Sequence, residues 1–191
     1  MTRTRLEAFS DGVIAILITI MVLELKAPHG QDWRALEPLV PTFLSYVLSF
    51  VYLGIYWSNH HHLFQVVPRV TGGILLANLH LLFWLSLVPF VTAWMGENHN
   101  APGPTAAYGA VMLAAALSFT LLTMTIVRTQ GAHSPLKAAV GRDRKSQVSL
   151  LLYALSIPAA FVNQWIADAI FVLVACAWLL PDRRIEAVAS E

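Results

Sequence analysis

Long runs of apolar residues, bounded by charges, prolines or glycines, divide the chain into six segments. The runs cover residues 9–25, 38–57, 72–95, 104–127, 146–162 and 165–180. A helix needs about 20 apolar residues to cross about 30 Å of hydrocarbon, and most of the runs approach that length. The runs are continuous and do not alternate with period two, which favours helices over the strands of a barrel. The pattern predicts an all-α membrane protein with six transmembrane helices.

The last two runs are separated only by Asn163 and Gln164. Both runs are near or below the length needed to cross the hydrocarbon, so they predict a short helical hairpin. We expect residues 1–181 to form one transmembrane domain and residues 182–191 to form a short cytoplasmic tail.

Composition agrees with a membrane location. The chain is 57% hydrophobic and 12% charged, whereas about a quarter of the residues of a soluble protein are charged. A net charge of +1 gives no reason to expect a nucleic-acid partner. The single cysteine, Cys176, excludes an intrachain disulfide and a cysteine-based zinc site, and we expect no cofactor.

Basic residues are distributed unevenly between the two sides of the predicted helices. Ten lie on the side of the termini and two, Lys26 and Arg34, lie on the other. Because basic residues are enriched in cytoplasmic loops, we expect a multi-pass protein of the cell membrane with both termini in the cytoplasm. The ten are Arg3, Arg5, Arg69, Arg128, Lys137, Arg142, Arg144, Lys145, Arg183 and Arg184.

The opposite side is acidic. It carries Glu24, Asp32, Glu37, Glu97 and Asp168 against the two basic residues. An acidic outer mouth favours cations if the protein forms a pore. The alternative is that topology alone depletes the outer loops of Lys and Arg.

The first predicted helix is unlike a helix that faces lipid. Only 12 uncharged residues separate Asp11 from Glu24, and as a helix they cover about 18 Å. Because ionisable groups in lipid cost several kcal/mol, this helix is expected to be sheltered by other helices or to face water. The alternative is that Asp11 and Glu24 mark the two interfaces of a locally thinned bilayer.

Polar residues on the side of the termini are candidate partners for one another. Arg5 supplies a counter-charge to Asp11, and Ser10 or Asp11 can cap the first helix. His60 and Asn78 lie on the same side, and buried polar groups need partners. His60 is followed by two more histidines, but adjacent helical residues point about 100° apart and cannot converge on one ion. We therefore expect neither a metal site nor an enzyme.

Several of these residues form a recognisable pattern, which resembles the transmembrane protein 175 family of potassium channels. The family's opening motif is a basic residue followed, after three positions, by Phe-Ser-Asp. The matching residues are Arg5, Phe9, Ser10 and Asp11, then Ala15, Ile16 and Thr19, then Trp57-Ser58-Asn59-His60, Leu63-Phe64, Asn78-Leu79 and Pro89-Phe90. The likeness covers the first three predicted helices in detail and the last three only in number and hydrophobicity.

The resemblance implies a homotetramer in which four copies of the first helix line a central pore. By motif offset, it places the pore constriction at Ile16, Ile20 and Leu23, with Thr19 and Glu24 as polar groups along the path. It also implies a structural network of Arg5, Phe9, Ser10, Asp11, Trp57, His60 and Asn78. The spacing of 16, 20 and 23 fits one stripe of a helix, but a core-packing stripe has the same spacing. Thr19 either faces the pore or bonds a carbonyl of its own helix.

The function implied is a potassium-selective cation channel without a carbonyl filter. A ring of isoleucines forces ions to shed water, and K⁺ sheds water more readily than Na⁺, so Rb⁺ and Cs⁺ are expected to permeate as well. The alternative is a secondary or proton-coupled cation transporter that uses Asp11, Glu24 and the histidines, although no inverted repeat is visible. A third interpretation is that the protein is an assembly scaffold in the membrane lipid and transports no ions.

Overall fold

The only regular secondary structure in the described part of the chain is helix. The computed structural model describes residues 2–29, 31–98, 101–131 and 144–179. The predicted all-α membrane fold with six apolar helical segments is confirmed. The predicted tail at 182–191 and four of the counted basic residues, Lys137, Arg142, Arg183 and Arg184, lie outside the described residues.

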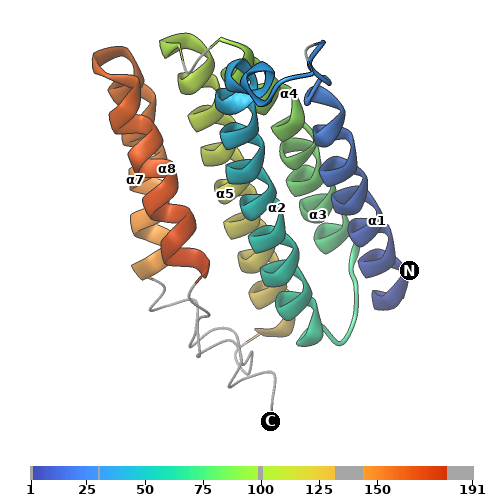
Figure 1. Ribbon diagram of the computed structural model, residues 1–191. Coiled ribbons are helices and arrows are strands. Elements are labelled where there is room, and N and C mark those ends of the chain that lie inside the picture. Colours follow the sequence, from blue (N-terminus) through green and yellow to red (C-terminus); the bar gives the residue numbers. More distant parts are fainter. Residues whose placement is uncertain (1, 30, 99–100, 132–143, 180–191) are drawn as a thin grey trace.

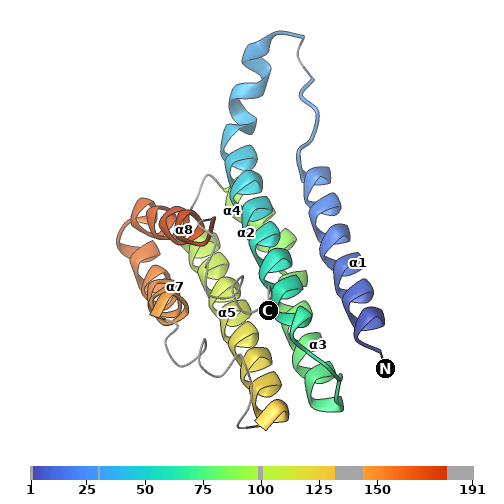
Figure 2. The ribbon, with the colours of Figure 1, turned by 90° about the horizontal axis from the view of Figure 1, so that it is seen from below.

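The helices form a row with α1 at one end and the α7–α8 hairpin at the other, and α2 to α5 lie between them (Figures 1 and 2). The α-helices are α1 (Arg3–Met21), α2 (Val40–Gln65), α3 (Gly72–Ser86), α4 (Val88–Glu97), α5 (Pro102–Gln130), α7 (Arg144–Val162) and α8 (Gln164–Leu179). Two 3-10 helices, η1 (Val22–Glu24) and η2 (Trp33–Leu39), lie in the connection from α1 to α2.

Five helical segments are long and apolar enough to cross a membrane. They are Arg3–Glu24, Trp33–Gln65, Gly72–Glu97, Pro102–Gln130 and Arg144–Val162, and α8 is a shorter apolar helix of 16 residues. Together they make the chain a multi-pass membrane protein.

The boundaries differ from the sequence prediction at three places. The run 72–95 forms two helices, because Pro89 in the first turn of α4 has no N–H with which to continue the ladder of α3. α2 continues to Gln65, so Trp57 and the three histidines lie within the helix. The α-helical part of the first segment ends at Met21, and Leu23 lies in η1.

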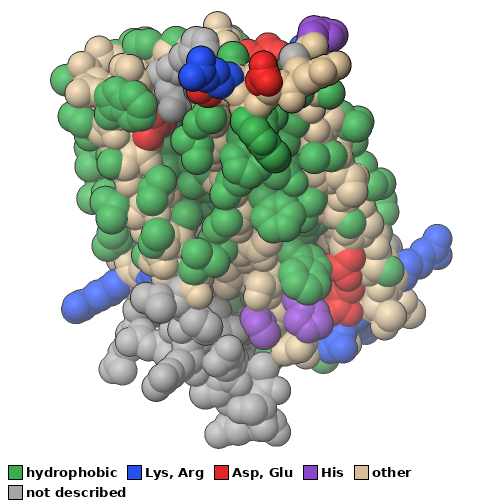
Figure 3. Space-filling view, in the orientation of Figure 1, with side chains coloured by type: hydrophobic (Ala, Val, Ile, Leu, Met, Phe, Trp, Pro, Cys, Tyr) green, Lys and Arg blue, Asp and Glu red, His purple; other side chains and the backbone are tan. Residues whose placement is uncertain are grey.

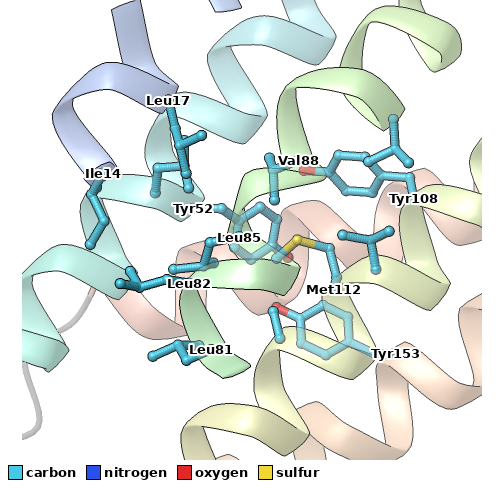
Figure 4. Close-up of a cluster of buried hydrophobic side chains, with 14 of the residues drawn as sticks. Ile14, Leu17, Tyr52, Leu81, Leu82, Leu85, Val88, Tyr108, Met112 and Tyr153 are labelled. Carbon is cyan, nitrogen blue, oxygen red and sulfur yellow. The ribbon is translucent and has the colours of Figure 1, made fainter. Parts of the chain in front are cut away.

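Apolar side chains from six helices meet in the middle of the molecule (Figure 4). Ile14 and Leu17 of α1 lie on the side of the cluster near Leu82 and Leu85 of α3, while Tyr108 lies on the far side. All five side chains are buried. One face of α1 is therefore part of the core of the chain.

A hydroxyl cluster crosses this core between α2, α4 and α5. Ser49 Oγ lies 2.7 Å from Thr92 Oγ1 and 3.0 Å from Tyr108 Oη, and Thr92 Oγ1 donates to Val88 O at 2.7 Å. All three hydroxyl-bearing side chains are buried. The apolar runs of the sequence give no sign of this cluster, because isolated Ser and Thr residues do not interrupt an apolar run.

Two glycines allow helices to approach closely. A β-carbon at Gly96 of α4 would lie 2.7 Å from Thr42 Cα of α2. A β-carbon at Gly109 of α5 would lie 2.6 Å from Ser156 Oγ of α7 and 3.3 Å from Phe171 Cζ of α8. Small residues at such crossings let helix backbones pack closely in a membrane.

We predict that Gly96→Ala destabilises the protein by about 1–3 kcal/mol, because the added methyl group meets backbone that cannot move aside. The measurement is the midpoint of thermal unfolding of the purified protein in detergent. Gly103→Ala is the control, since a β-carbon at Gly103 meets nothing within 4 Å. Equal midpoints for the two variants would contradict the close approach of α4 to α2.

Candidate functional site

The two faces of α1 have different surroundings. Leu6, Ser10, Ile14, Leu17 and Met21 are buried against the rest of the chain. Their spacing of three or four residues places them on one face of the helix. Within the part of the chain that the structure describes, the opposite face is exposed.

The three residues expected to form the constriction lie on the uncovered face. Ile16 is 60% exposed, Ile20 is 40% exposed and Leu23 is 73% exposed. Leu23 belongs to η1, whose tighter winding turns it slightly from the line that a continuous α-helix would give. The structure therefore brings the three residues together as an apolar stripe and excludes them from the protomer's core.

The two polar groups expected beside the stripe are also exposed. Thr19 Oγ1 donates to Ile16 O of its own helix at 2.8 Å. Glu24 ends η1, and the nearby Lys26 Nζ lies 3.3 Å from Glu97 Oε1 at the end of α4. Glu24 is thus the acidic residue that directly follows Leu23 of the stripe.

A buried chain of hydrogen bonds joins α1 to α3 and α2. Asn78 Nδ2 donates to Ser10 Oγ at 2.9 Å, and Ser10 Oγ donates to Leu6 O at 2.9 Å. His60 Nε2 lies 2.7 Å from Asn78 Oδ1. Because that oxygen accepts, His60 carries its proton on Nε2. Ser10, His60 and Asn78 are each at most 1% exposed, so no water replaces these bonds.

The resemblance placed Asp11 and Trp57 in one network, but the expected partner of Asp11 was Arg5. Trp57 Nε1 of α2 donates to Asp11 Oδ1 at 3.0 Å. The expected counter-charge, Arg5, is exposed and makes no ion pair with Asp11 within the chain, and Phe9 is exposed beside it. Arg3 lies 3.4 Å from Glu7 and donates to Gln65 O of α2. An indole N–H needs a hydrogen-bond acceptor when it is buried, and this need is the sequence signal that pointed to a contact of Trp57 with Asp11.

The three successive histidines do not share a partner, and the buried Nδ1 of His62 has no hydrogen-bond partner among the described residues. His60 bonds Asn78, whereas His61 Nε2 lies 2.9 Å from Gln65 Nε2 and its ring stacks on Trp57. Among the described residues, no three His, Cys, Asp or Glu side chains are grouped in a way that could hold a metal ion.

Apolar side chains cover the middle of the face in Figure 3, and charged and histidine side chains gather toward its two ends. A lipid-exposed band bounded by polar ends is the distribution expected of a membrane-spanning protein. The candidate stripe therefore lies on a helix that crosses this band, and the hydrogen-bonded chain joins that helix to α2 and α3.

Comparison with known proteins gives consistent matches. Residues 5–89 match the family model described as "Endosomal/lysosomal potassium channel TMEM175". A potassium channel of Chryseobacterium sp. is 53% identical over 97% of each chain. The endosomal/lysosomal proton channel TMEM175 of Gallus gallus is 35% identical over 52% of this chain and 23% of its own length. A crystal structure of a lysosomal potassium-selective channel TMEM175 homolog from Chamaesiphon minutus superposes with a TM-score of 0.79 and 28% identity, covering 93% and 96% of the two chains.

We predict that Asn78→Ala destabilises the protein by about 1–3 kcal/mol, because the substitution leaves the buried His60 N–H without an acceptor. The midpoint of thermal unfolding in detergent measures the change. Asn98→Ala is the matched control, since Asn98 is exposed and its side chain donates to Trp94 O of its own helical turn. If both variants unfolded at the same temperature, the buried chain would have no part in holding α1.

Proposed function

Because this chain belongs to the TMEM175 family, we propose that it is a subunit of a potassium-selective channel in the cell membrane. A bacterial relative that matches nearly the whole chain bears the name potassium channel. The structural neighbour that matches over nearly its whole length is titled potassium-selective. Support therefore comes from proteins of the same size and fold.

The observation that carries the proposal is the uncovered stripe of α1. A helix at the edge of the protomer that is buried on one face and exposed on the other is well placed to line a shared axis. In a homotetramer, four copies of Ile16, Ile20 and Leu23 would form three stacked apolar rings around that axis. The 12 uncharged residues between Asp11 and Glu24 cover about 18 Å, which suits a pore helix better than a lipid-facing one.

Conduction in this arrangement depends on dehydration. A narrow ring of branched alkyl side chains cannot replace the water around an ion, so each ion passes only after losing part of its hydration shell. K⁺ gives up water at lower cost than Na⁺, and Rb⁺ and Cs⁺ at lower cost still. The result is a moderate preference for K⁺ over Na⁺ with permeation of Rb⁺ and Cs⁺.

The polar groups along α1 divide into two roles. Thr19 and Glu24 lie along the proposed path, and Glu24 raises the local concentration of cations at one mouth. Ser10, Asp11, Trp57, His60 and Asn78 hold α1 against the rest of the protomer, and Arg5 and Phe9 lie on the uncovered face, where a neighbouring subunit would meet them. Their role is structural.

We predict that Ile16→Asn raises conductance and lowers the preference for K⁺ over Na⁺. Four amides in the ring would keep water in the constriction and lower the dehydration barrier for every small cation. The measurement is single-channel current and reversal potential in a planar bilayer with K⁺ on one side and Na⁺ on the other.

The matched control for this change is Leu121→Asn. Leu121 lies on α5 away from the stripe and is 46% exposed, so the control makes the same kind of substitution on another exposed face. Leu17→Asn should mainly damage packing, because Leu17 is 5% exposed. If the Ile16→Asn channel assembled and kept its conductance and selectivity, Ile16 would not be part of the constriction.

Flux measurements in liposomes separate the channel from the alternative transporter. A channel conducts K⁺ down its gradient in ohmic single-channel steps. A secondary or proton-coupled transporter gives slower flux, which changes with the opposing ion or pH gradient. Flux without resolvable single-channel steps would favour the transporter.

We predict that both termini lie in the cytoplasm. In a Cys176→Ala background, Gln31→Cys should react with a membrane-impermeant maleimide on intact cells, and Arg69→Cys should react only after permeabilisation. Both positions are exposed, and they lie on opposite sides of the apolar band. The reverse labelling pattern would invert the proposed orientation.

A further inference from the structure

The short helix η2 carries an apolar stripe that the described part of the chain does not bury. Its sequence is Trp-Arg-Ala-Leu-Glu-Pro-Leu, and none of its residues is buried. A 3-10 helix has three residues per turn, so residues three apart lie on one face. Trp33, Leu36 and Leu39 therefore form one face, and Arg34 and Glu37 form another. Trp33 is 88% exposed and Leu36 is 42% exposed.

Two prolines separate η2 from α2. Pro41 lies in the first turn of α2, where the absence of its N–H leaves no helical hydrogen bond unmade. In an α-helix that began earlier, residue 41 would have to donate to a carbonyl four residues before it, which proline cannot do. Pro38 has the same effect inside η2. η2 is therefore an element of its own, and in Figure 2 it extends past the end of α1, away from the other helices.

The polar boundary of the bundle passes close to η2. Gly96 of α4 meets Thr42 in the first turn of α2, and the next residue, Glu97, pairs with Lys26 at 3.3 Å. These charges lie at the level at which α2 begins and η2 ends. The 26 residues of α2 cover about 39 Å as a helix, which already exceeds the hydrocarbon thickness of about 30 Å. η2 is thus not needed for the crossing and lies at the level of the lipid headgroups.

Both faces of η2 match this environment. Tryptophan is enriched at the level of the headgroups, because its ring is apolar and its N–H is polar. Leu36 and Leu39 continue the face of Trp33 toward α2 and so toward the acyl chains. On the adjoining face, Arg34 and Glu37 are exposed and carry opposite charges, which complement the phosphate and the amine of a zwitterionic headgroup.

We propose that η2 is a membrane-surface anchor, in which the face of Trp33, Leu36 and Leu39 inserts between the headgroups and the acyl chains. Amphipathic helices bind bilayers with their apolar face at this boundary. The lipid then supplies the cover that η2 does not receive from the described part of the chain, and it holds the connection from α1 to α2 at the membrane surface. The anchor does not depend on ion conduction, so it can fail or hold independently of the proposed channel.

Spin labels on single cysteines test the proposal in lipid vesicles. In a Cys176→Ala background, each residue from 33 to 39 is replaced in turn by cysteine, labelled with a nitroxide and reconstituted with phosphatidylethanolamine and phosphatidylglycerol. The measurement compares the collision rate of the label with oxygen, which concentrates in the membrane, and with a water-soluble nickel complex. We expect the ratio of oxygen to nickel collisions to be high at 33, 36 and 39 and low at 34 and 37.

Two other positions calibrate this ratio. Leu155→Cys lies in the middle of α7 and is 49% exposed in the unaltered protein, so it reports the value for the acyl chains. Arg69→Cys lies in the exposed connection between α2 and α3 and reports the value for water. In the protein labelled at residue 36, Trp33→Ser should lower the ratio, whereas Glu37→Gln should leave it unchanged.

Each outcome of the scan bears on the proposal. An equal ratio at all seven positions of η2 would contradict an inserted face. Low collision rates with both reagents at 33, 36 and 39 would also contradict it, because they would show that protein, such as a second copy of the chain, covers the stripe. A ratio that peaks at every third residue, and that falls at residue 36 in Trp33→Ser, would support the anchor.

Discussion

The buried hydrogen bonds that join Ser10, Asn78 and His60 determine the position of α1, and the candidate site depends on that position. Unsatisfied polar groups inside a membrane cost several kcal/mol each, so α1 cannot turn or slide without breaking these bonds. A rotation by one residue would move Ser10 away from Asn78 by about 100° and would turn Ile16 toward the core. The same contact that stabilises α1 therefore orients the exposed stripe.

Apolar packing alone could not fix the rotation of α1 about its own axis. Lipid chains are as apolar as the side chains of α1, so burying Ile14 and Leu17 provides little preference for one rotation over another. The specific arrangement of the helices comes from hydrogen-bonded polar pairs and from close approaches between helix backbones. Ser49, Thr92 and Tyr108 fix α2 against α4 and α5, and Gly96 allows the backbones of α4 and α2 to meet.

The sequence predicted the helices better than the contacts between them. Hydrophobic runs of about 20 residues gave all six segments, because membrane thickness imposes a length that can be counted. The break at Leu87 was not predicted, since Pro89 within an apolar run can also produce a kink in a continuous helix. The bond from Trp57 to Asp11 was not predicted, because we expected the oppositely charged Arg5 to be the partner of Asp11, and not a neutral donor on another helix. The pairing of His60 with Asn78 was anticipated from their shared side and their need for partners, and its distance of 2.7 Å comes only from the structure.

The different surroundings of Arg5 and Asp11 bear on how copies of this chain would meet. Asp11 accepts a hydrogen bond from the neutral indole of Trp57, whereas Arg5 lies on the uncovered face that also carries Phe9 and Ile16. Four Arg5 side chains around one axis would repel one another and any entering cation unless a carboxylate lay near each. In a homotetramer a neighbouring copy would have to supply that carboxylate, because Asp11 of the same chain makes no ion pair with Arg5. The pairing of Arg5 with Asp11 thus stays a prediction.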